Sequence, residues 1–175
     1  MLQRFGTIGT IIEADAAALH DALNGLEDAA AAIVAARELM HAGLSEIVLS
    51  APVDLRDNRL QRFLVAALQS RREERMAVLF LDAANGLLAL ERVATGSYDG
   101  LTFRKRMLVQ RALELGARGI ILAHNHPSGD ARPSATDITS TDTLRAVLDP
   151  IEVTLVDHLI VARSRIFSMQ QGKLL

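Results

Sequence analysis

From residue 75 onward, hydrophobic residues occur in short runs separated by polar turns. The stretch RMAVLFLDAANGLLALERV holds two aliphatic runs joined by AANG, and Asn-Gly between such runs is typical of a β-hairpin. We therefore expect strands near residues 75–82 and 87–94. The run ARGIILAHN, residues 117–125, has the length and composition of a buried strand, and residues 151–170 predict a final hairpin or two consecutive strands.

Helical patterns occupy most of the remaining chain. Residues 14–23 and 26–44 are alanine-rich and are predicted to be helices, with stop signals at Asn24-Gly25 and Gly43. Helices are also expected over residues 103–116 and 134–148, which end at Gly116 and before Pro150. A further helix after Pro52 is predicted by apolar residues at helical spacing, namely Leu60, Phe63, Leu64, Ala67 and Leu68.

The predicted order of elements is helices, hairpin, helix, strand, helix and strands. This order favours an α/β fold, in the form of an α+β sandwich with mixed strand directions. We expect a helical N-terminal segment over residues 1–53 and a second domain over residues 54–175, to which the third predicted helix is assigned.

Composition narrows the range of functions. The chain has 175 residues, of which 50% are hydrophobic and 3% aromatic, so we expect a folded protein with an aliphatic core. The formal net charge of −2 gives no overall electrostatic reason to expect a nucleic-acid partner. Cysteine is absent, so disulfides and thiolate ligands are excluded and any metal site must use His, Asp or Glu.

Hydrophobic runs in the sequence are short. None approaches the roughly 20 apolar residues that span a bilayer, and the N-terminus lacks a basic region followed by a long apolar core. We therefore expect a cytoplasmic protein with no membrane partner.

Candidate metal chemistry is concentrated in LAHNHPSGDARPSATDI, residues 122–138. His124 and His126 lie one residue apart where a strand is expected to end, so their side chains project to the same side of an extended chain. Zinc accepts imidazole and carboxylate ligands, and a catalytic zinc site has three protein ligands. Asp137, in the first turn of the next predicted helix, is the best candidate for the third ligand.

The same residues also have structural interpretations. Ser134 and Asp137 resemble a helix capping box, which alone would explain both residues, although such boxes usually end in Glu or Gln. The two histidines could instead satisfy backbone groups of the loop. The metal site is favoured because the two histidines occur together with a Pro/Gly-containing loop and a Ser-x-x-Asp helix start.

HNHPSG followed by PSATD resembles the motif of the RadC-like proteins, a bacterial branch of the JAB/MPN (JAMM) metalloprotease superfamily. The JAMM pattern is His, one residue, His, seven residues, Ser, two residues and Asp, and His124, His126, Ser134 and Asp137 have this spacing. The resemblance extends from about residue 70 to the C-terminus and includes TG at 95–96 and DHLIV at 157–161. It implies the JAB/MPN cytidine-deaminase-like fold, with a mixed sheet flanked by helices.

The resemblance also implies roles for individual residues. Zn²⁺ would be held by His124, His126 and Asp137, and Ser134 would donate a hydrogen bond to the developing oxyanion. The family's upstream glutamate maps to Glu74 rather than to its neighbour Glu73, and Glu74 would be the general base. From the sequence alone, a solvated residue at the end of a charged helix, RREER, is the better explanation of Glu74, and Glu91 is a weaker rival for the base.

Three functions follow as hypotheses. The leading one is a JAMM-type metalloprotease that cleaves a peptide or isopeptide bond in a protein or peptide substrate, with a homodimer allowed for. The second is an accessory protein of DNA repair that binds nucleic acid, with a structural or phosphodiester-directed metal site. The third is an interaction module without turnover, disfavoured because all the ligand positions of the motif are filled.

Two further residues lie close to this chemistry. Asp157 and His158 are adjacent on a predicted strand, so their side chains should face opposite sides of the sheet. We expect them to act structurally or to support the metal ligands rather than to take part directly in the chemistry.

Overall fold

The computed structural model describes residues 1–6, 11, 14, 16–36, 39, 52–68, 73–93 and 101–175. The chain forms two compact units, Met1–Glu46 and Ile47–Leu175. The first unit contains α1 (Leu2–Phe5), α3 (Ala16–Ala22) and a helical stretch over residues 27–36. The two alanine-rich helices thus occur where the sequence predicts them, and residues 37, 38 and 40–44 of the second lie outside the described residues. The domain division after residue 53 stays a prediction.

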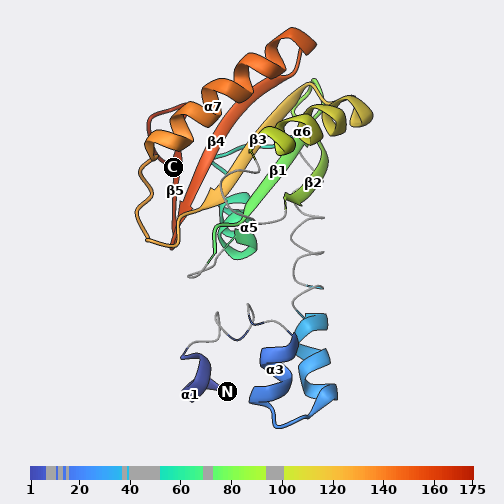
Figure 1. Ribbon diagram of the computed structural model, residues 1–175, viewed down its shortest axis with the longest axis vertical. Helices are drawn as coiled ribbons and strands as arrows, with labels where there is room; N and C mark the ends of the chain where they lie inside the picture. The colour runs from blue at the N-terminus through green and yellow to red at the C-terminus, as the bar shows by residue number, and fades with distance from the viewer. Residues whose placement is uncertain are drawn as a thin grey trace. The chain divides into compact units, whose positions relative to one another are not determined.

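The second unit is built on a mixed sheet, as the sequence predicts, and this sheet has six strands (Figure 1). Its strands follow the order β2-β1-β3-β4-β5-β6. Strands β3 and β4 are parallel, and the other neighbouring pairs are antiparallel. The strands are β1 (Met76–Leu81), β2 (Leu87–Val93), β3 (Gly119–Asn125), β4 (Thr154–Ala162), β5 (Arg165–Ser168) and β6 (Lys173–Leu174).

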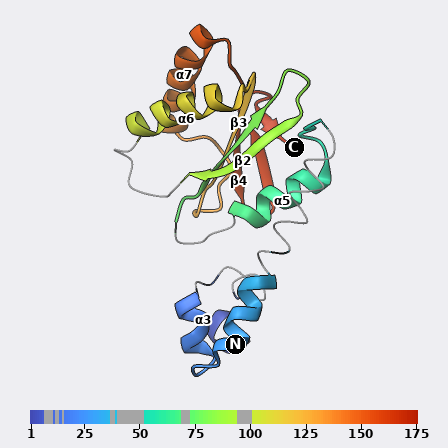
Figure 2. The same ribbon diagram turned by 90° about the vertical axis from the view of Figure 1, so that its right-hand side faces the viewer.

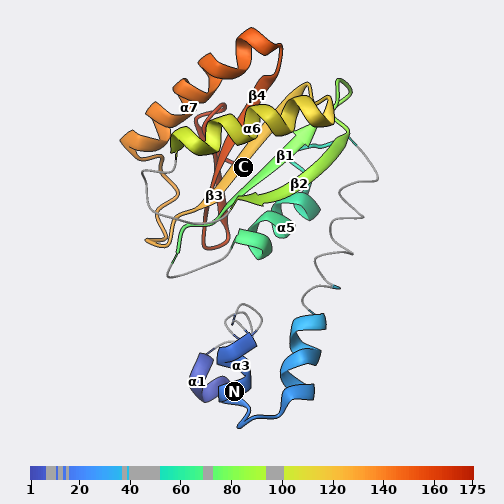
Figure 3. The ribbon, with the colours of Figure 1, turned by 45° about the vertical axis from the view of Figure 1, so that its right-hand side comes forward.

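Helices cover both faces of the sheet. Helices α6 (Leu101–Leu115) and α7 (Ala135–Leu148) lie side by side on one face, and α5 (Asn58–Leu68) lies on the other (Figures 2 and 3). The five apolar residues that predicted α5 are all buried. This arrangement confirms the fold class expected from the sequence.

Strand alternation determines which side chains face which helices. Ile120 and Leu122 of β3 belong to a buried cluster with residues of α6 and α7, including Leu108 and Leu144. Successive side chains of a strand point to opposite faces, so His124 continues this row toward α6 and α7. The first candidate ligand therefore faces the helix that carries Asp137.

The β1–β2 turn forms at the predicted Asn-Gly pair. Asn85 adopts a positive φ of 63°, a conformation that asparagine tolerates better than most residues. The Asp82 carboxylate accepts hydrogen bonds from the main-chain N–H groups of Ala84 and Gly86, which stabilises the tight connection. Two short elements were not expected from the sequence, the 3-10 helix η2 (Asp149–Ile151) and strand β6.

Candidate metal centre

Three candidate ligands converge where β3 ends and α7 begins. The Nε2 atoms of His124 and His126 are 2.9 Å apart. His124 Nε2 lies 3.2 Å from Asp137 Oδ1, and His126 Nε2 lies 3.3 Å from Asp137 Oδ2. One ligand atom from each residue falls within 4.8 Å of the others, and this is the group in the described part of the chain that is suited to hold a metal ion.

Asp137 is held in place by the start of its own helix. The main-chain N–H of Ser134 donates to Asp137 Oδ2 at 2.7 Å, and the Ser134 hydroxyl donates to the same oxygen at 2.6 Å. The Asp137 N–H donates back to Ser134 Oγ at 3.1 Å, which completes a capping box. The capping interpretation of these residues is therefore correct, and it coexists with the convergence of Asp137 on both histidines.

The loop after β3 orients His126. His126 Nδ1 lies 2.8 Å from the main-chain oxygen of Asp130, so Nδ1 carries the proton and donates it. Nε2 then presents a lone pair toward His124 and Asp137. Gly129, with a positive φ of 81°, allows the chain to turn here, and a Cβ at this position would lie 2.8 Å from Arg163 Nε.

A chain of hydrogen bonds orients His124. The Thr141 hydroxyl donates to the main-chain oxygen of Asp137 at 2.6 Å and lies 2.6 Å from His158 Nδ1. His158 Nδ1 therefore donates to Thr141, which leaves His158 Nε2 to accept from His124 Nδ1 at 2.9 Å. In this assignment His124 Nε2 is unprotonated and faces the other two ligands.

The donor set fits a divalent metal ion. Two imidazole lone pairs 2.9 Å apart beside a carboxylate repel one another unless a cation lies among them. Burial raises the pKa of Asp137, but the hydrogen bonds that Ser134 donates to its carboxylate act in the opposite direction, and the pKa lies well below its usual value. Asp137 is therefore an anionic ligand at neutral pH.

His158 is neutral in this environment. Burial is the main cause that lowers the pKa of His158, to about 3. A neutral imidazole can accept from His124 and donate to Thr141 at the same time. His158 thus supports the candidate ligand His124, which is one of the two roles expected for His158 from the sequence.

Asp157 faces the other side of β4 and has different partners. Its carboxylate accepts hydrogen bonds from the Ser168 hydroxyl at 2.5 Å and from the main-chain N–H groups of His158 and Gln170. Asp157 is buried, with 1% of its surface exposed. It joins β4 to the segment that follows β5, which is a structural role.

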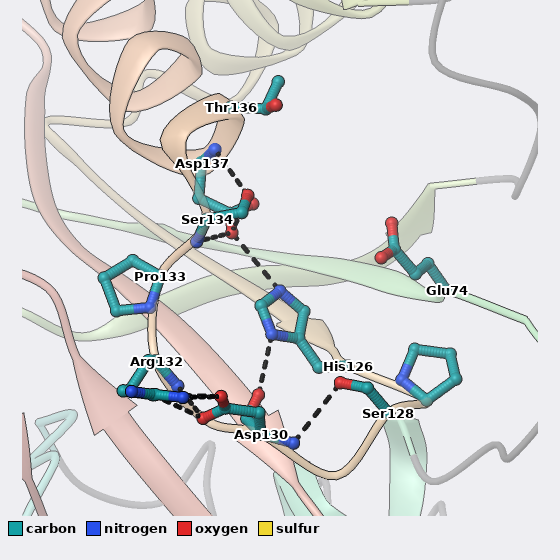
Figure 4. Close-up of a pocket in the computed structure, with 10 residues that line it drawn as sticks. Glu74, His126, Ser128, Asp130, Arg132, Pro133, Ser134, Thr136 and Asp137 are labelled. Carbon is teal, nitrogen blue, oxygen red and sulfur yellow. Dashed lines mark hydrogen bonds and ion pairs between the residues drawn. The ribbon is translucent and has the colours of Figure 1, made fainter.

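An open cleft of about 820 Å³ is lined by two of the three candidate ligands, His126 and Asp137. Figure 4 shows Glu74 on one side of this cleft, across from His126, Ser134 and Asp137. The rival Glu91 lies elsewhere, on β2, where its carboxylate accepts a hydrogen bond from Arg111 at 2.6 Å. Of the three glutamates weighed from the sequence, Glu73, Glu74 and Glu91, it is Glu74 that lines this cleft.

Comparison with known proteins identifies the family of the chain. The RadC-like JAB domain family matches residues 55–174. The chain belongs to the RadC-like JAB domain family. It is 37% identical over 176 residues to a UPF0758 protein of Methylibium petroleiphilum, covering 100% of this chain and 79% of that protein. A UPF0758 protein of Rhodobacter capsulatus is 35% identical over 179 residues, covering 100% of this chain and 82% of that protein.

Some relatives are longer. A UPF0758 protein of Burkholderia mallei is 37% identical over 173 residues, which are 98% of this chain and 62% of that protein. This chain therefore spans less than two thirds of the Burkholderia protein. Among the described residues of this RadC-like chain, no helix has the length and apolar character needed to cross a membrane.

Thr141 and the Asp130 carbonyl are parts of the site that sequence reasoning missed. Thr141 lies four residues after Asp137 on α7, so it occupies the same helix face, and this spacing is a signal that the sequence does contain. The Asp130 carbonyl is a main-chain atom, which no side-chain pattern identifies. The Thr141 hydroxyl and the Asp130 carbonyl together determine which histidine nitrogens can bind a metal.

Replacement of His158 by phenylalanine is expected to weaken metal binding at this candidate centre by about 10- to 100-fold. The aromatic side chain fills the buried space but removes the acceptor for His124 Nδ1 and the donor to Thr141. Zinc affinity, measured by competition with a chromophoric chelator, checks this result.

Asp157→Ala supplies the matched control on the same strand. Loss of its carboxylate leaves buried donors unpaired and is expected to lower the free energy of unfolding by about 1–3 kcal/mol. Its zinc affinity should stay near that of the unchanged protein because Asp157 faces away from the ligands. Equal zinc affinities for the two variants would show that His158 has no specific influence on the metal.

Proposed function

We propose that this chain is a zinc-dependent hydrolase that cleaves a peptide or isopeptide amide. The observation that carries the proposal is the convergence of His124 Nε2, His126 Nε2 and the Asp137 carboxylate beside an open cleft. Two imidazoles and one carboxylate are a ligand set of catalytic zinc, which leaves a coordination position free. When bound there, zinc supplies a Lewis acid that acidifies water and polarises a carbonyl.

The position of Glu74 at the cleft supports its proposed role as the general base. Glu74 lines the cleft opposite the ligands, and it precedes β1 at a point where the chain is exposed to solvent. In the proposed reaction its carboxylate takes a proton from the attacking water and then delivers it to the leaving amine. The amide C–N bond breaks after the water oxygen has bonded to the carbonyl carbon.

Ser134 is proposed to donate a hydrogen bond to the oxygen of the attacked carbonyl. Its hydroxyl donates to Asp137 Oδ2 in the structure and would have to turn toward the substrate. The main-chain N–H of Ser134 also donates to Asp137 Oδ2, at 2.7 Å. Asp137 therefore keeps one of its anchors while the hydroxyl serves the oxyanion.

Three other expectations stay predictions. They are the protein or peptide substrate, the homodimer and the cytoplasmic location. Nucleic-acid binding would need basic residues, and the sequence has two basic clusters: Arg71, Arg72 and Arg75, and, on α6, Arg104, Lys105, Arg106 and Arg111. Arg111 is engaged by Glu91 and by Glu114, at 2.6 Å and 3.1 Å. Arg71 and Arg72, from the other basic cluster, lie outside the described residues.

The proposal is tested with zinc-loaded protein and a panel of amide substrates. The panel contains unstructured peptides and peptides joined through a lysine isopeptide bond, and products are identified by mass spectrometry. We expect cleavage that a chelator abolishes and that added zinc restores. If zinc binds at one ion per chain and no amide in either class is cleaved, the interaction-module hypothesis replaces the hydrolase.

A further inference from the structure

Asn125 lies between the two candidate histidine ligands, and its side chain faces a different part of the molecule. It is buried, with 3% of its surface exposed. Its Oδ1 accepts a hydrogen bond from the Arg75 N–H at 2.5 Å, and its Nδ2 donates to the Glu73 carbonyl at 3.0 Å. One side chain thus holds the main chain on both sides of Glu74.

The contact occurs where β1 and β3 separate. The last paired residues of these antiparallel strands are Met76 and His124, so Asn125 stands opposite Arg75 in the same register. The Asn125 N–H donates to the Arg75 carbonyl at 3.2 Å, which is one of the two bonds expected of a hydrogen-bonded antiparallel pair. The second bond is made by the Asn125 side chain in place of its main-chain oxygen.

Because the Asn125 side chain takes the place of its main-chain oxygen, the chain after Asn125 can follow a different path from β1. The Asn125 amide extends the pairing with the segment before β1, while the chain after Asn125 leaves β1 and pairs at His126 with the Val161 carbonyl of β4. The β1–β3 pairing ends at Met76 and His124, and beyond this point Asn125 continues the link between the backbone that carries the ligands and the backbone that carries Glu74.

We propose that Asn125 is a positioning residue that holds Glu74 at the edge of the metal cleft. The inference rests on the proposed function in so far as Glu74 is the general base. Glu74 is exposed, so its own side chain is not fixed by packing. The hydrogen bonds to Glu73 and Arg75 supply the constraint at the main chain instead.

The chemistry of the contact requires an amide. The Arg75 N–H needs an acceptor and the Glu73 carbonyl needs a donor, and the asparagine side chain offers one of each at a single planar group. Aspartate keeps the acceptor and lacks the donor. Asn125→Asp should therefore retain the contact to Arg75 and lose the contact to Glu73, whereas Asn125→Ala loses both.

The first test uses hydrogen exchange of the metal-free protein and does not depend on activity. We expect the Arg75 amide to exchange about tenfold faster in Asn125→Ala, because it loses its acceptor. In Asn125→Asp its exchange should stay close to that of the unchanged protein. The amide of Leu79, deeper in β1, is the internal control. An unchanged Arg75 amide in Asn125→Ala overturns the proposal.

The second test uses kinetics of the zinc-loaded enzyme. Asn125→Ala is expected to lower kcat by about 10- to 100-fold at unchanged zinc content, because a small displacement of a catalytic group is costly. In a Glu74→Gln background the same change should lower kcat no further, because Asn125 acts through Glu74. Ile120→Val, a mild core change on β3, controls for loss of stability.

The outcomes separate the positioning role from the hydrolase proposal. If Asn125→Ala lowers kcat by the same factor in the Glu74→Gln background as in the unchanged protein, Asn125 acts independently of Glu74. That result overturns the inference. If the unchanged protein cleaves no amide, the proposed function fails and the base-positioning role fails with it. In that event the exchange experiment still decides whether Asn125 holds the two segments together.

Discussion

Glu74→Gln is expected to lower kcat for amide cleavage by about 10²- to 10⁴-fold, the usual contribution of a general base. Glutamine keeps the size of the side chain and its place beside the cleft, but it cannot take a proton from water. Glu74 does not belong to the ligand group, so zinc content should be unchanged. Rates measured at saturating substrate, together with zinc analysis of the same preparation, check this result.

Two matched variants sharpen the experiment. Glu73→Gln changes the neighbouring side chain, which does not line the cleft, and should leave kcat within a few-fold of the unchanged protein. Glu91→Gln removes the partner of Arg111 on β2 and should likewise retain activity. Full activity in Glu74→Gln, with loss of activity in Glu91→Gln, would reverse the assignment of the base.

Asp137→Asn is expected to weaken zinc binding by about 100- to 1,000-fold. Structural zinc sites with four ligands contribute about 10–16 kcal/mol, which corresponds to roughly 3 or 4 kcal/mol for each ligand. Asparagine has the shape of aspartate but lacks the negative charge, and it can present an N–H₂ group to the histidines. Chelator competition and metal analysis after dialysis both measure the change.

The control for Asp137→Asn lies on the same helix. Asp142 is an exposed carboxylate of α7 that pairs with Arg145 at 3.3 Å. Asp142→Asn should keep full zinc affinity, because an exposed ion pair of this kind contributes little and does not face the ligands. Equal zinc losses in both variants would mean that the net charge of α7, rather than coordination by Asp137, governs metal binding.

Local sequence signals predicted most of the fold. The Asn-Gly pair identified the β1–β2 hairpin because the turn depends only on adjacent residues. Apolar spacing identified α5 because the same residues form its buried face. Strand β6 was missed because it is only two residues long and depends on pairing with β5 rather than on its own pattern.

The ligand group was also predictable, because its residues lie in one short segment. His124 and His126 share a strand end, and Asp137 follows at the first turn of α7. The assignment of Glu74 as the general base depended on the family resemblance, since a glutamate in a charged stretch carries little information by itself.

The supporting contacts could not be read from the sequence, since they join distant segments. The His124–His158 contact depends on the parallel register of β3 and β4, which shifts between Ile120 and Ile121. The Asn125 contact depends on where β1 and β3 separate, 50 residues apart along the chain. Neither the register nor the point of separation leaves a pattern in one sequence.

The central claim is that His124, His126 and Asp137 close around one divalent cation. Diffraction at the zinc absorption edge, from crystals of the zinc-loaded protein, tests it most directly. We predict one anomalous peak per chain, at about 2.0–2.2 Å from both Nε2 atoms and from a carboxylate oxygen of Asp137. A fully loaded crystal with no peak at this junction, or with its zinc held by other residues, would contradict the claim.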